Sequence, residues 1–251
     1  MPMQISISNS IGGGGGNLGS GGGSSFTNTK SILLDGVDDF VDYGNPASLQ
    51  ITDELSISAW FKTTYTGATS VIVGKDAAAG TNKRAYMLFW SGATNTMRFF
   101  VWKSGNLGKS VASTSTVTDG NWHHVLAVND GTDLKIYVDG TLEGTNLGGG
   151  GTIQNATTDF YIGRRQGLSN GLYKSFWNGS IDEVAIWNSD QSSNVSTIYN
   201  SGLPNDISSL SPVSWWRCGD GDTAPTLTDN GSGGNNGTMT NFSTFSTDVP
   251  T

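Results

Sequence analysis

The chain has 251 residues and a formal net charge of −8, because 21 Asp and Glu outnumber 13 Lys and Arg. This acidic balance, without a basic cluster, excludes nucleic-acid backbone binding, which requires clustered Lys and Arg to displace counterions. The single cysteine, Cys218, excludes an internal disulfide, so the stability of the fold must come from packing.

The N-terminal region has the composition of an arm and a linker. Its first residues, MPMQISISNSIGGGGG, lack the basic and apolar regions of a secretory signal peptide, and no stretch approaches the roughly 18 apolar residues of a membrane helix. We therefore expect neither Sec-dependent export nor membrane insertion. Residues 12–25, GGGGGNLGSGGGSS, hold too few side chains to bury and predict a flexible linker. Residues 1–29 are accordingly assigned to an N-terminal arm and linker, and residues 30–251 to one domain.

From residue 30 onward, short apolar runs alternate with Gly, Asn and Asp turn signals at roughly 8–12-residue spacing, which is typical of an all-β sandwich. Asp130-Gly131 and Asp139-Gly140 are dipeptides that tolerate the positive φ of tight hairpins. One helix is predicted over 192–202. The predicted strands are 31–36, 39–44, 55–63, 70–75, 84–90, 96–102, 123–130, 134–140, 159–165 and 180–188.

Several of these segments resemble the laminin-G-like group of concanavalin A-like jelly rolls, in the chain order of that family. The resemblance covers about residues 30–202. It implies an all-β fold made of two antiparallel sheets packed as a jelly-roll sandwich, with one short helix after the closing strand. The matching segments are LLDGVDDFV (33–41), LSISAWFK (55–62), NWHHV (121–125), LKIYVDG (134–140) and FWNGSIDEVAIWN (176–188).

Residues 213–242 resemble a part of this family that stands at the other end of its domain. The sequence SWWRCGDGDTAPTLTDNGSGGNNGTM (214–239) is similar to the Trp-containing strand, Gly- and Asp-rich turns and Gly-Thr pair with which the domain commonly begins. Here it follows the closing strand, so the resemblance implies a permuted sandwich that 213–242 completes. A truncated second domain and strands given to a neighbouring subunit are the alternatives. About thirty residues are too few for a core of their own, which favours completion.

Strands 84–90 and 96–102 are apolar on both faces. Alternation assigns one set of their side chains to the core and turns the other set, which includes Met87, to the opposite face. The core set is Tyr86, Leu88, Trp90, Met97, Phe99 and Val101. An outward aromatic surface indicates a platform for stacking sugars or a protein interface, unless loops or the C-terminal segment cover it. The predicted ligand or interface residues are Phe89, Arg98, Phe100 and Trp102.

Related jelly rolls often hold a calcium ion at a sheet edge, and the resemblance implies such a structural Ca²⁺ here. The candidate ligands are Asp35, Asp38 and Asp182, which the first and last core strands contribute if these strands pair. Carboxylate oxygens suit a hard cation. The alternative is that these side chains cap backbone N–H groups in strand-end turns. We expect no other cofactor.

The sequence lacks the motifs of the enzymes that share this resemblance. Glucanases of the wider superfamily carry a Glu-x-Asp-x-x-Glu run on one strand. Here Asp182 and Glu183 are adjacent, so alternation predicts that they point to opposite faces and cannot flank one glycosidic bond. A Gly-x-Ser-x-Gly elbow and a phosphate-binding loop are also missing. We therefore expect a protein that is not an enzyme.

A lectin-like fold without an export signal favours a protein that is made in the cytoplasm and becomes extracellular when a phage lyses its host. We predict a non-enzymatic structural or adhesion protein on the virion surface, in the capsid surface, tail or fibre. Its partners would be other virion proteins, copies of itself and host surface glycans. The alternatives are a secreted bacterial carbohydrate-binding module exported by another route, and a degenerate glycoside hydrolase.

Overall fold

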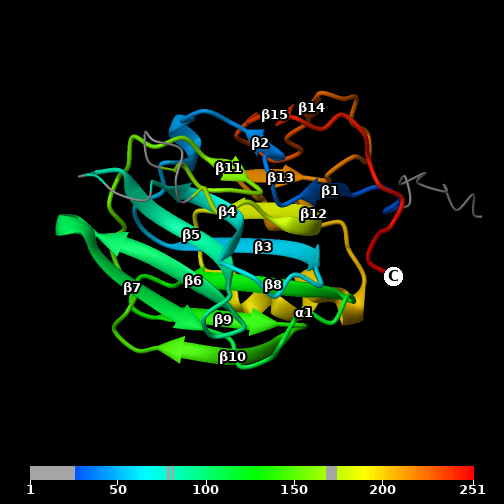
Figure 1. The fold of residues 1–251 in the computed structure, drawn as a ribbon. Helices are drawn as coiled ribbons and strands as arrows, with labels where there is room; N and C mark the ends of the chain where they lie inside the picture. The colour runs from blue at the N-terminus through cyan, green and yellow to red at the C-terminus, as the bar shows by residue number, and fades with distance from the viewer. Residues whose placement is uncertain (1–25, 78–79, 81, 168–173) are drawn as a thin grey trace, which may run out of the picture.

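Two antiparallel sheets pack face to face in the computed structural model, which describes residues 26–77, 80, 82–167 and 174–251 (Figure 1). The first sheet has the order β1-β12-β3-β8-β9-β10, and β13 also pairs with β12. Its strands are β1 (Ile32–Asp35), β3 (Leu55–Lys62), β8 (Trp122–Asn129), β9 (Leu134–Val138), β10 (Thr141–Asn146), β12 (Asn178–Trp187) and β13 (Ser214–Trp216).

The second sheet has the order β14-β15-β2-β11-β4-β5-β6-β7. Its strands are β2 (Phe40–Asp42), β4 (Ser70–Asp76), β5 (Arg84–Ser91), β6 (Thr96–Lys103), β7 (Leu107–Ala112), β11 (Tyr161–Ile162), β14 (Thr226–Leu227) and β15 (Gly237–Thr240). The predicted all-β, two-sheet antiparallel sandwich is therefore confirmed. The predicted linker at 12–25 lies outside the described residues.

One short α-helix, α1 (Val195–Tyr199), follows β12 and confirms the predicted helix in a shorter form. It packs on the outer face of the first sheet, where Val195 and Ile198 meet Leu126 of β8 and Trp187 of β12. Within the described residues, no helix is long and apolar enough to cross a membrane. Single 3₁₀ turns lie at Ala47–Leu49, Ser104–Asn106, Ser192–Asn194, Asn200–Gly202 and Ser208–Leu210.

The core lies between the sheets and follows the alternation of the strands. All six side chains assigned to it from strands 84–90 and 96–102 are buried there, with Tyr86 and Phe99 fully enclosed. Trp90, Trp177 and Trp216 are the largest side chains of this core. Burying such rings removes a large apolar area from water, at roughly 25 cal/mol per Å², so they dominate the stability of the sandwich.

Two strands that the sequence does not signal complete the sheets at one end. β7 (LGKSVA) and β10 (TLEGTN) have few β-branched or aromatic residues and no clear alternation. They become strands because β6 and β9 offer them a hydrogen-bonding edge. Pairing with a preformed neighbour outweighs weak intrinsic β-propensity.

The C-terminal segment adds β13 to the first sheet and two strands, β14 and β15, to the second. β13 pairs with β12 in the first sheet, with Trp215 opposite Ala185, and β15 pairs with β2 in the second, with Met239 opposite Val41. Figure 1 shows these orange and red strands beside the blue strands β1 and β2. The beginning and the end of the described chain therefore share the same side of the sandwich.

The two adjacent tryptophans of β13 face opposite ways, as alternation requires. Trp216 is fully buried between the sheets, where it stacks on Phe160 at 5.5 Å and donates its Nε1–H to the Asn235 carbonyl at 2.7 Å. Trp215 lies on the outer face, where Phe26 covers it at a centroid distance of 6.2 Å. Phe26 belongs to the range that the sequence assigns to the linker, and it contacts the sandwich.

Replacing Trp216 with alanine should lower the free energy of unfolding by roughly 3–5 kcal/mol, because it removes a fully buried ring and leaves a cavity. The measurement is urea unfolding followed by circular dichroism. The control is Leu33→Ala in β1, whose side chain is 58% exposed, and it should change stability by less than about 0.5 kcal/mol. A loss below about 1 kcal/mol for Trp216→Ala would mean that the C-terminal segment is peripheral to the core.

Candidate functional site

An apolar cluster lies on the outer face of the second sheet, on the side away from the core. Val71 of β4, Met87 and Phe89 of β5, and Trp102 of β6 form it, with Phe100 packed against them. The rings of Phe100 and Trp102 stack at 4.8 Å and 24°, and Phe89 lies 6.2 Å from Phe100. The structure therefore brings together three of the predicted ligand residues, Phe89, Phe100 and Trp102.

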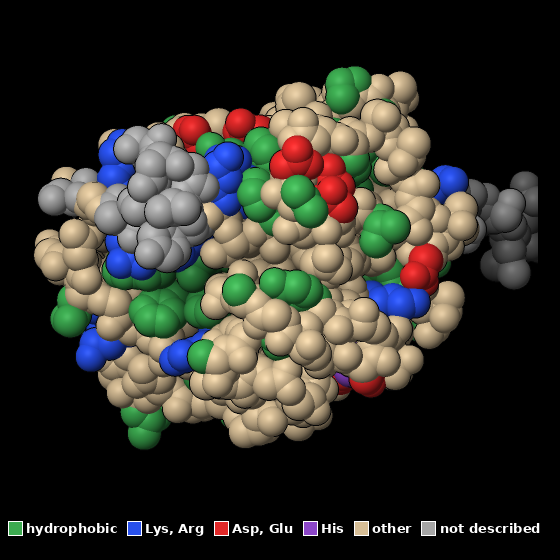
Figure 2. Space-filling view, in the orientation of Figure 1, with side chains coloured by type: hydrophobic (Ala, Val, Ile, Leu, Met, Phe, Trp, Pro, Cys, Tyr) green, Lys and Arg blue, Asp and Glu red, His purple; other side chains and the backbone are tan. Residues whose placement is uncertain are grey.

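These rings form the floor of a hollow and not an exposed platform. Only 6% of Phe89 and 3% of Trp102 are exposed, whereas Phe100 is half-buried. The hollow has a volume of about 320 Å³, and none of its described lining residues comes from the C-terminal segment. It is lined by Thr69, Arg84, Met87, Phe89, Phe100, Trp102 and Arg165. Figure 2 shows hydrophobic surface in the region of β5 and β6, with Lys and Arg side chains around it.

Asp76, at the end of β4, fixes two arginines at this hollow. Its fully buried carboxylate accepts a hydrogen bond from Arg84 Nε at 2.9 Å and another from Arg165 Nη1 at 3.2 Å. Burial raises the pKa of Asp76, and the two guanidiniums oppose that rise. The Arg84 guanidinium also lies 4.1 Å from the centroid of the Trp102 ring, within the range of a cation–π interaction. The ion pairs thus hold positive charge over an aromatic floor.

Arg98, the fourth predicted ligand residue, lies beside the hollow and does not line it. Its guanidinium is 5.9 Å from the Phe100 ring, and its Nη2 donates to Ser110 Oγ at 3.1 Å. Its Nε is buried and has no hydrogen-bond partner in the described part of the chain. Sequence reasoning missed Arg84 and Arg165. Residue 165 reaches Asp76 only through contacts made after β11, where Ala77 and Gln166 form a parallel bridge and the Gln166 N–H donates to the Asp76 carbonyl.

A larger groove, of about 630 Å³, lies near the end of β6 and has a different character. Its described lining residues include no aromatic side chain, and its one large apolar side chain, Ile153, is 1% exposed. They are Thr52, Asn82, Lys103, Ser104, Thr152, Ile153, Gln154 and Asn155. Hydrogen bonds to polar groups alone contribute little net binding free energy, because the free ligand forms similar hydrogen bonds with water. The aromatic hollow is therefore the stronger candidate.

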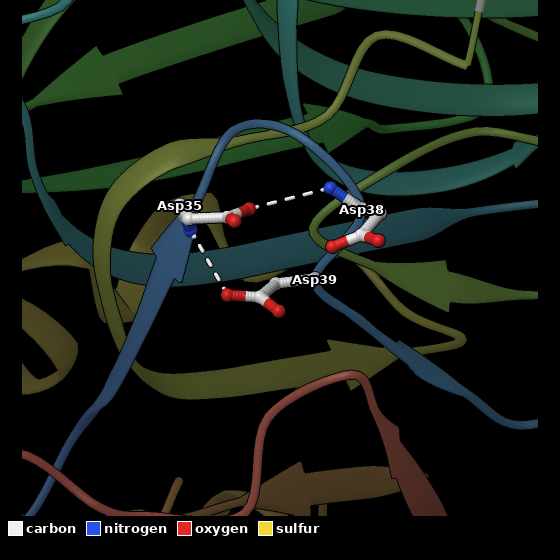
Figure 3. Close-up of side chains that lie close together, drawn as sticks. All are labelled: Asp35, Asp38 and Asp39. Carbon is white, nitrogen blue, oxygen red and sulfur yellow. Dashed lines mark hydrogen bonds between the residues drawn. The ribbon is translucent and has the colours of Figure 1, made fainter.

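Two of the predicted metal ligands, Asp35 and Asp38, meet in the loop after β1, together with Asp39 (Figure 3). One carboxylate oxygen from each lies within 4.8 Å of the others. Asp35 Oδ1 accepts the N–H groups of Val37 and Asp38, which lowers the pKa of Asp35. Burial, with the nearby charges of Asp35 and Asp38, raises the pKa of Asp39. Both readings of the sequence, backbone capping and a cluster of hard oxygen ligands, therefore apply to this loop.

The third predicted metal ligand, Asp182, does not join this cluster. Asp35 pairs with Asn178 at one end of β12, and Asp182 lies four positions further along that strand. Its carboxylate accepts a hydrogen bond from Asn28 Nδ2 at 2.8 Å instead. Asp35, Asp38 and Asp39 would supply three of the roughly six to eight oxygen ligands that Ca²⁺ takes. They therefore provide only part of a calcium site.

The expectation that Asp182 and Glu183 point to opposite faces is wrong. The register of β12 against β3 shifts between Asp182 and Ala185, and Glu183 adopts a positive φ of 47°. This bulge inserts one residue, so strict alternation fails locally. Glu183 turns to the outer face, where it accepts hydrogen bonds from Trp215 Nε1 at 2.6 Å and Arg217 Nε at 3.1 Å. Asp182 lies beside it, and the two carboxyl groups interact electrostatically.

This acidic pair is closed to a substrate. Asp182 is 0% exposed and Glu183 is 4% exposed. Their hydrogen bonds go to Asn28, Trp215 and Arg217. Burial raises the pKa of both groups, and that of Glu183 reaches about 7. A raised carboxyl pKa is a property of catalytic acids, but here it results from enclosure between the two ends of the chain.

Known proteins share this fold. The family described as the concanavalin A-like lectin/glucanases superfamily, of laminin G type, matches residues 35–194. No curated protein sequence matches the chain. A solved structure of a candidate carbohydrate binding protein from Bacteroides ovatus ATCC 8483 matches 90% of this chain with a TM-score of 0.68 and 19% identity. The chain spans only 62% of that protein.

Two further solved structures are similar to smaller parts of the chain. A heptameric SAP-like pentraxin from Limulus polyphemus has a TM-score of 0.52 and 18% identity, covering 68% of this chain and 82% of its own. The CBM40 of a Ruminococcus gnavus IT-sialidase has a TM-score of 0.50 and 13% identity, covering 66% of this chain and 97% of its own. At such identities these likenesses show the fold.

Calcium binding by the loop after β1 stays a prediction that the melting temperature can test. If Asp35, Asp38 and Asp39 bind Ca²⁺ only in the folded state, adding calcium after chelation should raise the melting temperature by a few degrees. Asp38→Asn should abolish this shift without disturbing the loop, because its carboxylate accepts no hydrogen bond among the described residues. Equal melting temperatures with calcium and with chelator would remove the metal.

The buried acidic pair predicts a pH dependence of stability. Because the pKa of Glu183 is raised from 4.5 to about 7 in the folded state, folding takes up a proton between these values. The stability that this proton uptake contributes is complete below pH 4.5 and is lost as the pH rises through 7. Glu183→Gln should reduce the fall in unfolding free energy between about pH 5 and pH 8 by roughly 2–3 kcal/mol.

Urea unfolding at several pH values measures this slope. An unchanged slope in Glu183→Gln would show that Glu183 titrates alike in the folded and unfolded states.

Proposed function

Because the chain belongs to the laminin-G-type family of the concanavalin A-like lectin/glucanase superfamily, we propose that it is a non-enzymatic, lectin-like module that binds carbohydrate. The observation that carries the proposal is the hollow on the outer face of the second sheet. There, half-buried Phe100 stacks on Trp102, and the guanidinium of Arg84 lies over the same aromatic floor.

This combination suits a sugar ring. The C–H faces of a pyranose pack on an aromatic ring, and its hydroxyl groups need hydrogen-bond donors at the edge of that ring. The Arg84 and Arg165 guanidiniums supply such donors, and Asp76 already fixes their orientation. Fixed donors lose less conformational entropy when a ligand binds. The likeness to the Bacteroides ovatus protein and to the CBM40 of the Ruminococcus gnavus sialidase supports the same function.

The acidic pair on β12 supports a protein without glycosidase activity. Hydrolysis of a glycosidic bond needs two carboxyl groups that flank the substrate. Asp182 and Glu183 are enclosed, and their oxygens are engaged by Asn28, Trp215 and Arg217. A degenerate glycoside hydrolase, one of the alternatives from the sequence, would use this pair, so its burial argues against that alternative.

Phe100→Ala should weaken the binding of any glycan that the protein binds by roughly tenfold. A ring stack contributes about 1 kcal/mol or more, and 1.4 kcal/mol corresponds to a factor of ten in affinity. The experiment is a glycan array followed by calorimetry, with release of reducing ends measured on every glycan that binds. The matched control is Leu107→Ala on β7, where the side chain is 56% exposed and outside the hollow. The proposal would be contradicted if the array retained no glycan, if the Phe100 variant bound as tightly as the wild type, or if a bound glycan were hydrolysed.

For the biological setting we propose a structural or adhesion protein on the surface of a virion, which meets host glycans after lysis. The glycine-rich sequence of residues 12–25 supports a tether between a particle and the sandwich. The likeness to the Bacteroides ovatus protein supports the alternative, a secreted bacterial carbohydrate-binding module. Neighbouring capsid and tail genes would favour the first setting, and neighbouring polysaccharide-utilisation genes would favour the second.

A further inference from the structure

We propose that the ligand is an acidic oligosaccharide, bearing carboxylate or sulfate groups, which lies across two adjoining hollows that share Arg165. This inference rests on the proposed carbohydrate binding and adds the charge and the length of the ligand. It comes from the distribution of cations over the outer face of the second sheet.

A second hollow, of about 440 Å³, adjoins the aromatic one. Thr69 and Arg165 line both hollows, so the two are contiguous. The second hollow contains its own ring, half-buried Phe176, and its own cation, Lys174, whose Nζ lies 5.8 Å from that ring. Its other lining residues are Gly36, Tyr65, Ala68 and Ser175. Each hollow thus repeats the same pairing of an aromatic ring with a cation.

The arginines are concentrated on this face although the chain is acidic. Four of the five arginines of the sequence contact its rings or line its hollows, and the fifth, Arg217, lies on the other sheet beside Glu183. Arg164 has its guanidinium 4.2 Å from the rings of both Phe40 and Tyr161. The four arginines of the face are Arg84, Arg98, Arg164 and Arg165.

The positive charge of the residues that line the two hollows is only partly neutralised. Among the described residues that line the two hollows, none is acidic, whereas Arg84, Arg165 and Lys174 carry three positive charges. Asp76, beneath them, offsets one of these charges. A neutral sugar needs donors but no net charge, so this excess fits a ligand that is itself an anion. Guanidinium forks match the paired oxygens of a carboxylate or sulfate.

The experiment compares acidic polymers with neutral partners of the same backbone. Polygalacturonate is compared with its fully methyl-esterified form, and dextran sulfate with dextran, by affinity electrophoresis of the full chain. We expect the protein to bind each acidic polymer that retards it at least roughly tenfold more tightly than it binds the neutral partner of that polymer. The preference should disappear at about 1 M salt, which screens charges beyond about 3 Å. Preference for only one acidic polymer also supports the proposal and identifies the anion.

Single charge removals test the two hollows separately. Arg165→Gln and Lys174→Gln should each weaken retention by the acidic polymer roughly tenfold, and Lys174→Gln does so without removing a partner of Asp76. The control is Lys135→Gln on β9, in the other sheet, where Lys135 pairs with Asp130 at 2.6 Å. It removes the same charge and should leave retention unchanged. Trigalacturonate should bind at least tenfold more tightly than galacturonate if the ligand spans both hollows, since each hollow contributes about 1.4 kcal/mol or more.

The outcomes separate this inference from the proposed function. Equal binding of acidic and neutral polymers, weakened by Phe100→Ala but not by the charge variants, would overturn the inference and leave carbohydrate binding in place. Equal weakening by Lys135→Gln and Arg165→Gln would also overturn it, because the attraction would then be that of the whole molecule. Binding of no carbohydrate would overturn both proposals.

Discussion

The sandwich depends on β12, whose one edge is shared by two strands from opposite ends of the chain. β1 pairs with residues 178–181 of this edge, and β13 pairs with residues 184–186. The other edge of β12 pairs with β3. β1 and β13 together therefore occupy the place of one strand, and each alone would leave half of an edge unpaired. An unpaired edge exposes backbone donors and acceptors and invites wrong pairing.

The bulge at Asp182 and Glu183 lies at the junction between these two strands. The chain enters β1 through residues 26–31 and leaves β13 through residues 217–220, so both passages meet opposite the bulge. The hydrogen bond from Asn28 to Asp182 and that from Arg217 to Glu183 hold them there. Thr29 also donates its Oγ1–H to Asp220, at 2.6 Å. The acidic pair thus joins the two ends of the described chain.

The sequence predicts those parts of the fold in which side chains repeat with the period of a strand. β5 and β6 carry enough apolar residues to define both faces, so their core and outer side chains were assignable without a structure. β7 and β10 were not predictable, because they form strands only by pairing with the edges of β6 and β9. The bulge in β12 was also beyond prediction. A glutamate at positive φ is uncommon, and it is stable here because Trp215 and Arg217 bind its carboxylate.

The candidate site shows the same division between local and distant information. Its rings come from two adjacent strands and follow from alternation, whereas its cations come from residues that are far apart in the chain. Asp76 and Arg165 are 89 positions apart, and no spacing rule joins them. The one signal in the sequence is that the aromatic strands of an acidic chain contain basic side chains, Arg84 and Arg98.

Asp76 also determines what kind of binding the hollow can provide. A buried carboxylate without partners would be neutral or costly, and the two arginines make its charged form acceptable at this depth. Asp76 also holds the Arg84 guanidinium over the Trp102 ring and the Arg165 guanidinium at the hollow before any ligand binds. An anionic ligand would then compete with Asp76 for the same donors, so each contact gains less than an isolated arginine would give. Selectivity for charge must therefore come from several cations acting together, which is the arrangement that the face between Trp102 and Phe176 provides.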